Sequence, residues 1–120
     1  MKYIISLMVL MLTLACSTKQ FLYRKPVIGY VYIKGHAVTA LSVRYDSTDV
    51  LSRQDVVTDL NGRFVMPKVV LKNYQEFRRM SSRINSWLNF YNNGGKIFSI
   101  DLKKYDLSND TINVGKINIE

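Results

Sequence analysis

Cysteine and histidine are almost absent from this sequence. The chain of 120 residues contains one cysteine, Cys16, and one histidine, His36. A single thiol excludes an intramolecular disulfide, and one thiol with one imidazole cannot form a cysteine-histidine metal site. We therefore expect no metal and no cofactor, and the place of Cys16 in the chain matters more than its redox chemistry.

The sequence also lacks an apolar run long enough to cross a bilayer. The run from Ile4 to Leu14 has eleven residues, which as a helix would span about 16 Å, roughly half of the hydrocarbon thickness. Lys2 precedes this run and the small residue Ala15 follows it. A charged start, a short apolar stretch and a small residue predict a signal peptide over residues 1–15 rather than a membrane anchor.

The residues around the only cysteine suggest how the exported chain is retained. Thr13-Leu14-Ala15-Cys16 resembles the lipobox of bacterial lipoproteins, although such motifs usually have Leu where Thr13 stands. The resemblance implies cleavage between Ala15 and Cys16 and lipid on the Cys16 thiol, a membrane attachment worth about 0.8 kcal/mol per buried methylene. Ser17, rather than aspartate, follows the cysteine, which by the same resemblance favours the outer membrane. The alternative is a soluble secreted protein cut after Ala15.

Acidic residues are outnumbered, so charge restricts the class of partner. The formal net charge is +8, and removal of Lys2 with the signal peptide would leave 16 basic and 9 acidic residues. Such an excess suits anionic lipid or an acidic protein partner, whereas export argues against nucleic acid. The densest basic cluster, Arg78, Arg79 and Arg83, forms with Trp87 a candidate binding surface; the alternative is ordinary solvated surface.

Periodicity predicts an all-β domain. Seven segments rich in β-branched and aromatic residues are bounded by turn residues at short intervals, which is typical of an antiparallel sandwich. These segments are residues 27–33, 38–45, 53–58, 63–66, 84–91, 96–102 and 111–119. Asp59, Asn61 and Gly62 predict a hairpin turn. Residues 74–83 are expected to be irregular or a short helix, because aromatic residues recur there at helical spacing.

These patterns divide the chain into three parts. We expect a signal peptide at 1–15, a lipidated cysteine with a polar tether at 16–25, and one β-sandwich domain at 26–120. Lys19, Arg24 and Lys25 of the tether either lie against anionic headgroups or are simply solvated. Trp87, Phe90 and Tyr91, with Tyr74 and Phe77, are expected in the core or on an aromatic binding surface.

Three motifs resemble one known family. They are Ile28-Gly29-Tyr30-Val31, the series Gly35-His36-Ala37-Val38 with Leu41-Ser42-Val43, and Thr58-Asp59-Leu60-Asn61-Gly62-Arg63-Phe64. Together they resemble the carboxypeptidase regulatory-like domains of the prealbumin (transthyretin-like) sandwich type, over roughly residues 26–70. The resemblance implies a binding or structural module with no active site. Hydroxyisourate hydrolases of this type need several histidines and a carboxyl-terminal Tyr-Arg-Gly-Ser, whereas this chain has one histidine and ends in Ile119-Glu120.

Motif analysis favours no catalytic or metal chemistry. His36 falls in an expected turn, and the calcium-loop pattern that Asp59, Asn61 and Gly62 begin lacks its closing glutamate, because Val70 stands there. We therefore expect a non-enzymatic outer-membrane lipoprotein that binds an envelope protein, in an oligomeric state that the sequence leaves open.

Three alternatives to this function remain. The first is a type VI-like secretion component, since the outer-membrane lipoprotein of that machine is also a prealbumin-like sandwich. The second is an enzyme or small-ligand carrier whose site is assembled from distant residues such as His36, Asp59 and Arg63. The third is an immunity lipoprotein whose basic surface faces an acidic partner.

Overall fold

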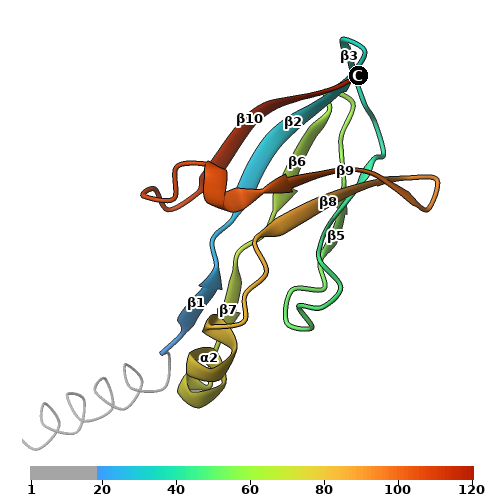
Figure 1. Ribbon diagram of the computed structural model, residues 1–120. Coiled ribbons are helices and arrows are strands. Elements are labelled where there is room, and N and C mark those ends of the chain that lie inside the picture. The colour runs from blue at the N-terminus through green and yellow to red at the C-terminus, as the bar shows by residue number, and fades with distance from the viewer. Residues whose placement is uncertain (1–18) are drawn as a thin grey trace, which may run out of the picture.

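Two four-stranded sheets form the body of the molecule (Figure 1). The structure, a computed structural model, describes residues 19–120. The expected signal peptide, its cleavage between Ala15 and Cys16, and the lipidation of Cys16 lie outside the described residues. One sheet consists of β10 (Ile112–Ile119), β2 (Val27–Ile33), β3 (His36–Ala37) and β6 (Arg63–Met66). The other has the order β5 (Asp55–Val57), β4 (Ser42–Tyr45), β8 (Trp87–Asn92) and β9 (Gly95–Asp101), and η1 (Leu102–Lys104) follows β9.

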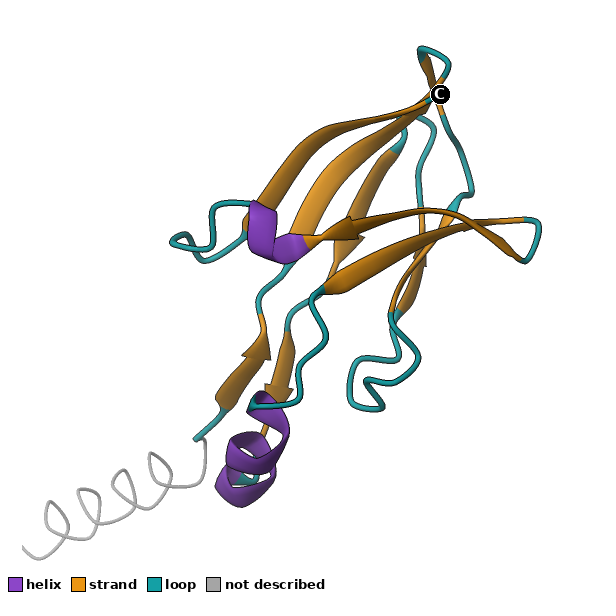
Figure 2. Ribbon diagram, viewed as in Figure 1, coloured by secondary structure: helices purple, strands orange, loops and turns teal. Residues whose placement is uncertain are grey.

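The hydrophobic core lies between the two sheets. Alternate residues of the strands point inward, as the burial of Val27 and Val31 on β2 and of Phe64 and Met66 on β6 shows. Phe64 meets Phe90 of β8 edge to face, with ring centroids 5.6 Å apart and ring planes at 76°. The fold is thus an all-β sandwich with one short α-helix, as the sequence pattern predicted (Figure 2).

The last strand runs in an unexpected direction. β10 pairs with β2 in parallel, although all other strand pairs in the described part of the chain are antiparallel. The register shifts between Asn113 and Lys116, where Gly115 adopts φ of 65°. A positive φ is available to glycine at little cost, so Gly115 permits this irregularity. The sandwich is therefore not purely antiparallel.

All seven predicted strands exist, although some are shorter than expected. The segment 38–45 forms a strand only over Ser42–Tyr45, because Ala40 adopts φ of 61° and interrupts the extended backbone. Leu41, Val43 and Tyr45, which alternate along this segment and so share one face, are all buried. His36 belongs to β3, whereas the turn before it consists of Lys34 and Gly35, both with positive φ.

The predicted hairpin at Asp59, Asn61 and Gly62 is a turn of a different kind. The Asp59 carboxylate accepts from the backbone N–H groups of Asn61 and Arg63 at 2.9 Å, and Gly62 has φ of 76°. However, β5 pairs with β4 and β6 pairs with β2, so the strands on the two sides belong to different sheets. The tight turn is real, but it carries the chain across the sandwich instead of closing a two-stranded hairpin.

The ambiguous region 74–91 contains both elements that its sequence suggested. Helix α2 (Tyr74–Ser81) begins after Asn73, whose side chain accepts a hydrogen bond from the Glu76 N–H at 3.1 Å and so caps the helix. β8 follows and forms an antiparallel hairpin with β9. The helix and the hairpin are thus both confirmed.

A two-stranded ladder projects from the sandwich and carries α2 (Figure 1). β1 (Phe21–Arg24) pairs with β7 (Val69–Leu71). This corrects the prediction of a polar tether over residues 16–25, because residues 21–24 form a strand. We call residues 19–26 and 67–86 the arm, and residues 27–66 and 87–120 the sandwich.

The two prolines of the chain separate the arm from the sandwich. Val27 pairs with Met66 in the sandwich and Arg24 with Val69 in the arm, so one register continues across the boundary and sets Pro26 opposite Pro67. Proline has no N–H to donate, so a ladder does not continue through such a pair. The arm is therefore an interrupted extension of the β2–β6 ladder.

Candidate functional site

A buried ion pair joins the arm to the sandwich. Arg24 of β1 is 7% exposed and Asp49, in the loop between β4 and β5, is 3% exposed. The Arg24 Nη2 and Nε atoms lie 2.5 Å and 3.1 Å from Asp49 Oδ2. Nε also donates to Ser52 Oγ at 2.6 Å, and Nη2 to the Asn85 carbonyl at 2.6 Å. One guanidinium thus binds the loop and the segment that follows α2.

A β-bulge in β1 explains why two consecutive side chains reach this cluster. The register of the β1–β7 ladder shifts between Leu22 and Arg24, which leaves Tyr23 as the extra residue. In a regular strand, neighbours point to opposite faces, but a bulge re-aims one of them. Tyr23 and Arg24 are accordingly both buried, and the Tyr23 hydroxyl donates to Asp49 Oδ1 at 3.0 Å.

Two buried tyrosines enclose the ion pair. The Arg24 guanidinium carbon lies 3.9 Å from the centroid of the Tyr45 ring, within the range of a cation–π contact. Burial raises the pKa of Tyr23 to about 12, and the hydrogen bond to the Asp49 carboxylate adds to this effect. Burial likewise raises the pKa of Tyr45 to about 12. Both phenols are therefore neutral hydrogen-bond donors at physiological pH.

We call the group formed by Tyr23, Arg24, Asp49 and Ser52 the clamp, because its hydrogen bonds hold two parts of the chain together and leave no catalytic set. Asp49 Oδ1 accepts from the Tyr23 hydroxyl and from the Leu51 N–H, and Oδ2 accepts from Arg24. Both oxygens of the carboxylate are thus occupied by donors from within the protein. The hydrogen bonds of Arg24 and Tyr23 join the arm to Asp49 and Ser52 of the loop between β4 and β5, so the evident effect of the clamp is to fix the arm on the sandwich.

Two cavities flank the clamp, one on each side of Tyr45. The first, of about 240 Å³, is chiefly apolar, and Val27, Leu102 and Ile112 are among its walls. Lys25, Arg24 and Lys103 also line it. An apolar pocket with a few polar groups is the usual form of a small-molecule site.

The second cavity, of about 310 Å³, is more polar. It lies among Arg44, Tyr45, Gln54 and Tyr91, and the Arg44 guanidinium carbon stacks 4.0 Å from the Tyr91 ring centroid. Three buried polar atoms on its walls have no hydrogen-bond partner within the described part of the protein: Arg44 Nε, Tyr45 Oη and Gln54 Oε1. Arg44 Nε lies 3.8 Å from Asp55 Oδ2, so of the three it has a charged neighbour. Buried polar atoms without a hydrogen-bond partner are rare in folded proteins.

The residues that the sequence singled out do not converge on these cavities. Arg78 and Arg79 are exposed on α2, and Arg83 is exposed just after it. Trp87 is 45% exposed at the start of β8, a strand of the sandwich. The structure therefore divides this candidate surface between the arm and the sandwich.

The aromatic residues expected in the core or on one binding surface are likewise divided between the arm and the sandwich. Phe90 is buried in the core and Tyr91 lines the second cavity, whereas Tyr74 and Phe77 pack against Phe21 of β1. The ring centroids of Tyr74 and Phe77 lie 5.2 Å and 5.5 Å from that of Phe21. These contacts hold α2 on the first strand.

The residues proposed for a dispersed site stay apart from both cavities. His36 and Arg63 are exposed on β3 and β6, and the Asp59 carboxylate is occupied by backbone N–H groups of its own turn. Neither cavity is lined by any of the three. Over residues 19–120 the structure brings together no group of three or more histidine, cysteine or carboxylate side chains suited to a metal.

Little in the sequence indicates the clamp. Its charge pattern places Arg24 in a tether, exposed or against headgroups, and Asp49 and Ser52 resemble ordinary turn residues. The partners of Arg24 lie more than twenty residues away in the chain. A register shift in a four-residue strand leaves no periodic pattern, so no local signal marks Tyr23 and Arg24 as inward-facing.

Comparison with known proteins does not assign the chain to a family. No protein-family model and no curated protein matches it. Among solved structures, a 9R-lipoxygenase from Cyanothece PCC8801 aligns with a TM-score of 0.38 and 12% identity, covering 81% of this chain and 16% of that chain. So weak a likeness carries no conclusion about fold or activity. Within residues 19–120, no helix has the length and apolar character needed to span a bilayer.

Proposed function

We propose that this protein is a non-enzymatic, lipid-anchored lipoprotein of the outer membrane whose sandwich binds another envelope protein. The anchor would be Cys16, after removal of residues 1–15. The observation that carries the proposal is the attachment of β1, which starts only five residues after Cys16 and is joined to the sandwich through Arg24 and Asp49. A lipid at Cys16 would therefore hold the sandwich at a short, defined distance from the bilayer.

A prealbumin-like module would suit this role. The motifs at residues 26–70 that resemble carboxypeptidase regulatory-like domains support a binding or structural task, and the clamp offers no free base or nucleophile. The exposed strand edges of the sandwich, such as three-residue β5 at the end of its sheet, present unpaired backbone groups that a partner strand could join.

The anchor is tested by the mass and the location of the protein. Protein extracted from membranes should carry the mass of attached acyl chains on Cys16 and should lack residues 1–15. Cys16→Ser should move the protein from the membrane fraction to the soluble fraction, whereas Ser17→Ala should not. Unmodified wild-type protein, or Cys16→Ser protein that stays membrane-bound, would contradict the anchor.

The cavities favour a second candidate function, that of a small-ligand carrier. Residues that line the polar cavity include buried polar atoms without a hydrogen-bond partner, and the neighbouring cavity is chiefly apolar. Native mass spectrometry of protein purified without denaturation would reveal a retained ligand. Tyr45→Phe removes a hydroxyl without a hydrogen-bond partner from a residue that lines the polar cavity, so it should weaken retention there, while Tyr30→Phe, at an exposed strand position, should not.

A further inference from the structure

Within residues 19–120, the excess positive charge is confined to the arm. The sandwich contains eight basic and eight acidic residues and is formally neutral. The arm contains eight basic residues and one acidic residue, Glu76, which gives it a charge of +7. The basic residues are Lys19, Arg24, Lys25, Lys68, Lys72, Arg78, Arg79 and Arg83. Only Arg24 is buried among them, in its ion pair with Asp49.

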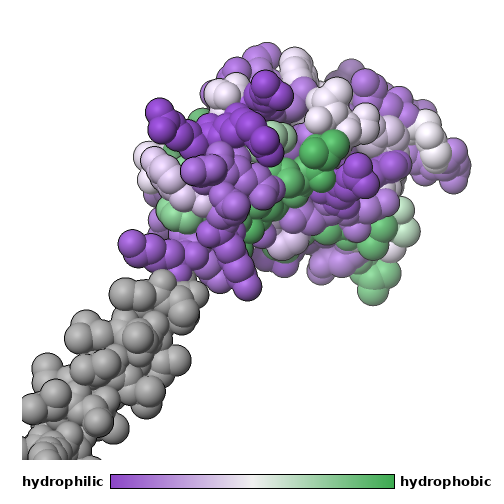
Figure 3. Space-filling model, turned by 90° about the horizontal axis from the view of Figure 1, so that it is seen from below, coloured by the Kyte–Doolittle hydropathy of each residue, from purple (hydrophilic) through white to green (hydrophobic). Residues whose placement is uncertain are grey.

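The outer face of α2 presents part of this charge to solvent. Phe77 and Tyr74 turn toward Phe21 of β1. Gln75 and Arg79 lie on another side of the helix, and Arg78 lies between that side and Tyr74; all three are exposed. Figure 3 views the molecule from the end that carries the arm and shows a largely hydrophilic surface with smaller apolar patches.

The same end of the molecule lies next to the expected lipid. Phe21 follows Cys16 by five residues, and five extended residues reach at most about 18 Å. Since Phe21 contacts α2 directly, a lipid on Cys16 would hold the helix beside the bilayer, where a shorter path of these five residues brings basic side chains within one Debye length, about 8 Å, of the headgroups. Each basic residue near an anionic membrane surface contributes a favourable interaction.

We propose that the arm is a membrane-contact surface, on which Arg78, Arg79 and Arg83 bind anionic lipid headgroups of the bilayer that holds the anchor. This inference rests on the proposed lipid anchor at Cys16. Its physical basis is charge complementarity: the neutral sandwich gains little from an anionic surface, whereas the arm is attracted to it. The contact would orient the sandwich, with α2 toward the bilayer and the β8–β9 hairpin away from it.

A fluorescent label on α2 tests the contact in the full mature protein. In acylated protein, Cys16 is blocked, so Gln75→Cys introduces the only free thiol and takes an environment-sensitive dye on the outer face of the helix. Asn92→Cys places the same dye on the β8–β9 hairpin. The protein is reconstituted into vesicles of phosphatidylcholine alone or of phosphatidylcholine with one third phosphatidylglycerol.

The expected result depends on both the lipid and the label position. Emission from the Gln75→Cys label should shift to shorter wavelength in the phosphatidylglycerol vesicles, and the shift should shrink at high salt. The Asn92→Cys label should give the same emission in both vesicles. Equal emission from the α2 label in both vesicle types, or a shift that ignores salt, would overturn the proposal.

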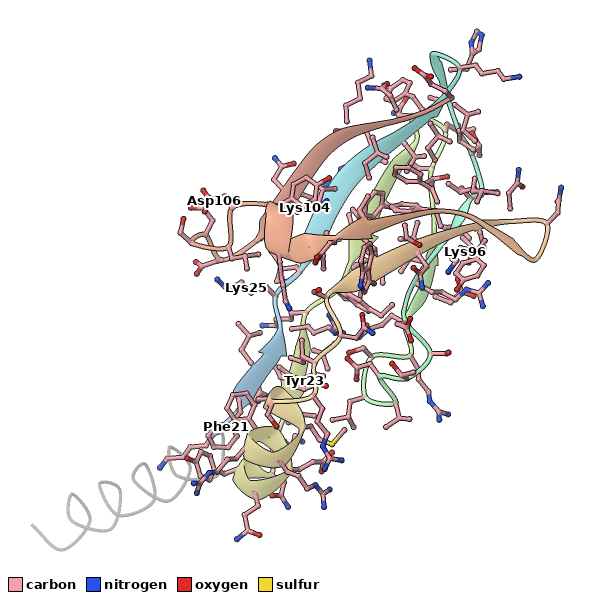
Figure 4. All side chains as sticks on the ribbon, in the orientation of Figure 1. Phe21, Tyr23, Lys25, Lys96, Lys104 and Asp106 are labelled. Atoms are coloured by element: carbon pink, nitrogen blue, oxygen red, sulfur yellow. The ribbon has the colours of Figure 1, made fainter. Side chains whose placement is uncertain are left out.

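Two triple variants that remove equal charge distinguish an effect of the arm from an effect of the net charge of the protein. Arg78→Gln, Arg79→Gln and Arg83→Gln together should abolish the lipid-dependent shift. Lys34→Gln, Lys96→Gln and Lys104→Gln remove the same charge from exposed positions of the sandwich, in the turn before β3, near the β8–β9 hairpin and in η1, and should leave the shift intact. Figure 4 labels Lys96 and Lys104. Equal losses from the two triple variants would show a general charge effect and contradict a specific contact.

The intact mass of each sample separates this proposal from the anchor. Acylated protein that gives no lipid-dependent shift would refute the membrane contact and leave the anchor standing. Protein without acyl mass would refute the anchor, and the label would then be placed on the variant Gln75→Cys with Cys16→Ser, which has a single thiol, and measured with the same vesicles added in excess. A label that responds to an acidic envelope protein but not to phosphatidylglycerol would replace the lipid by a protein partner.

Discussion

The arm and the sandwich are built from the same chain but are held together by different forces. The sandwich buries a continuous set of apolar side chains between two sheets and has no net charge. The arm has a short ladder, three contacting aromatic rings and one buried ion pair, and it holds the charge excess. Apolar burial is tolerant of detail, whereas a buried ion pair depends on its geometry. The arm should therefore be the part that single polar substitutions disturb.

The largest expected effect is in the sandwich core. Phe64→Ala should lower the free energy of unfolding by about 3–5 kcal/mol, because it removes a fully buried ring that packs on Phe90 and leaves a cavity. Val65→Ala, the neighbour on the outer face of the same strand, should change the free energy by less than about 0.5 kcal/mol. Urea unfolding measures both. Similar losses for the two variants would contradict the inward and outward assignment of β6.

The sandwich could be predicted well from the sequence for a physical reason. Alternation of apolar and polar residues is a local property, so the pattern alone assigns Leu41, Val43 and Tyr45 to one face, and all three are buried. The turn at Asp59–Gly62 is equally visible in the sequence, but which strands it joins depends on long-range pairing, and the hairpin prediction was wrong.

The arm was largely missed for the complementary reason. Lys19, Arg24 and Lys25 make β1 polar, which is typical of a tether. The ladder that orders it comes from a distant strand, and the partner of Arg24 lies 25 residues away. Helix α2 is the exception, because its aromatic spacing is local.

Removal of the buried carboxylate should have the next largest effect. Asp49→Ala leaves Arg24 buried without a counter-charge and should lower the free energy of unfolding by about 3–5 kcal/mol. The loss would affect either global unfolding of the whole chain or a local opening of the arm alone. Hydrogen exchange of β1 and β7 amides, compared with those of β2 and β6, separates the two possibilities. Since replacing both charges is often tolerated, Arg24→Met with Asp49→Leu should be less harmful than Asp49→Ala alone. A double variant that unfolds more readily than Asp49→Ala would show that the clamp gains more from pairing than apolar packing can supply.

Alkaline titration of Tyr23 and Tyr45 should also weaken the clamp, gradually and only above about pH 10. The pKa values of Tyr23 and Tyr45 are raised to about 12 in the fold from about 10 in the unfolded chain. Below pH 10 both phenols are neutral in either state, and their full contribution to stability is present. As the pH rises from about 10 to about 12, the unfolded chain loses these protons first, so stability falls by a few kcal/mol in all.

Urea midpoints across this pH range measure the fall. Tyr45→Phe should make the decline shallower, and Tyr23→Phe should do so as well. Tyr30→Phe serves as the control, because Tyr30 is 40% exposed and should not change the slope. Lysines titrate in the same range, which is why the comparison among variants, rather than the absolute slope, carries the test. If neither Tyr23→Phe nor Tyr45→Phe changed the slope of stability against pH, the role of the buried phenols would be contradicted.

The smallest expected effect concerns the cap of α2. Asn73→Ala removes the side-chain acceptor of the Glu76 N–H and should destabilise the helix by about 1 kcal/mol. Because α2 has eight residues and meets the rest of the arm mainly through Phe21, this loss should appear as faster hydrogen exchange in α2, while the core strands β2 and β8 keep their protection. Asn73→Asp retains an acceptor and should restore the wild-type rate, and Asn109→Ala, at an exposed loop position, should have no effect. Hydrogen exchange that becomes faster by the same factor in β2 and α2 would show that the arm and the sandwich unfold as one unit. Pro26 and Pro67 would then interrupt the ladder but would not make the arm less stable than the sandwich.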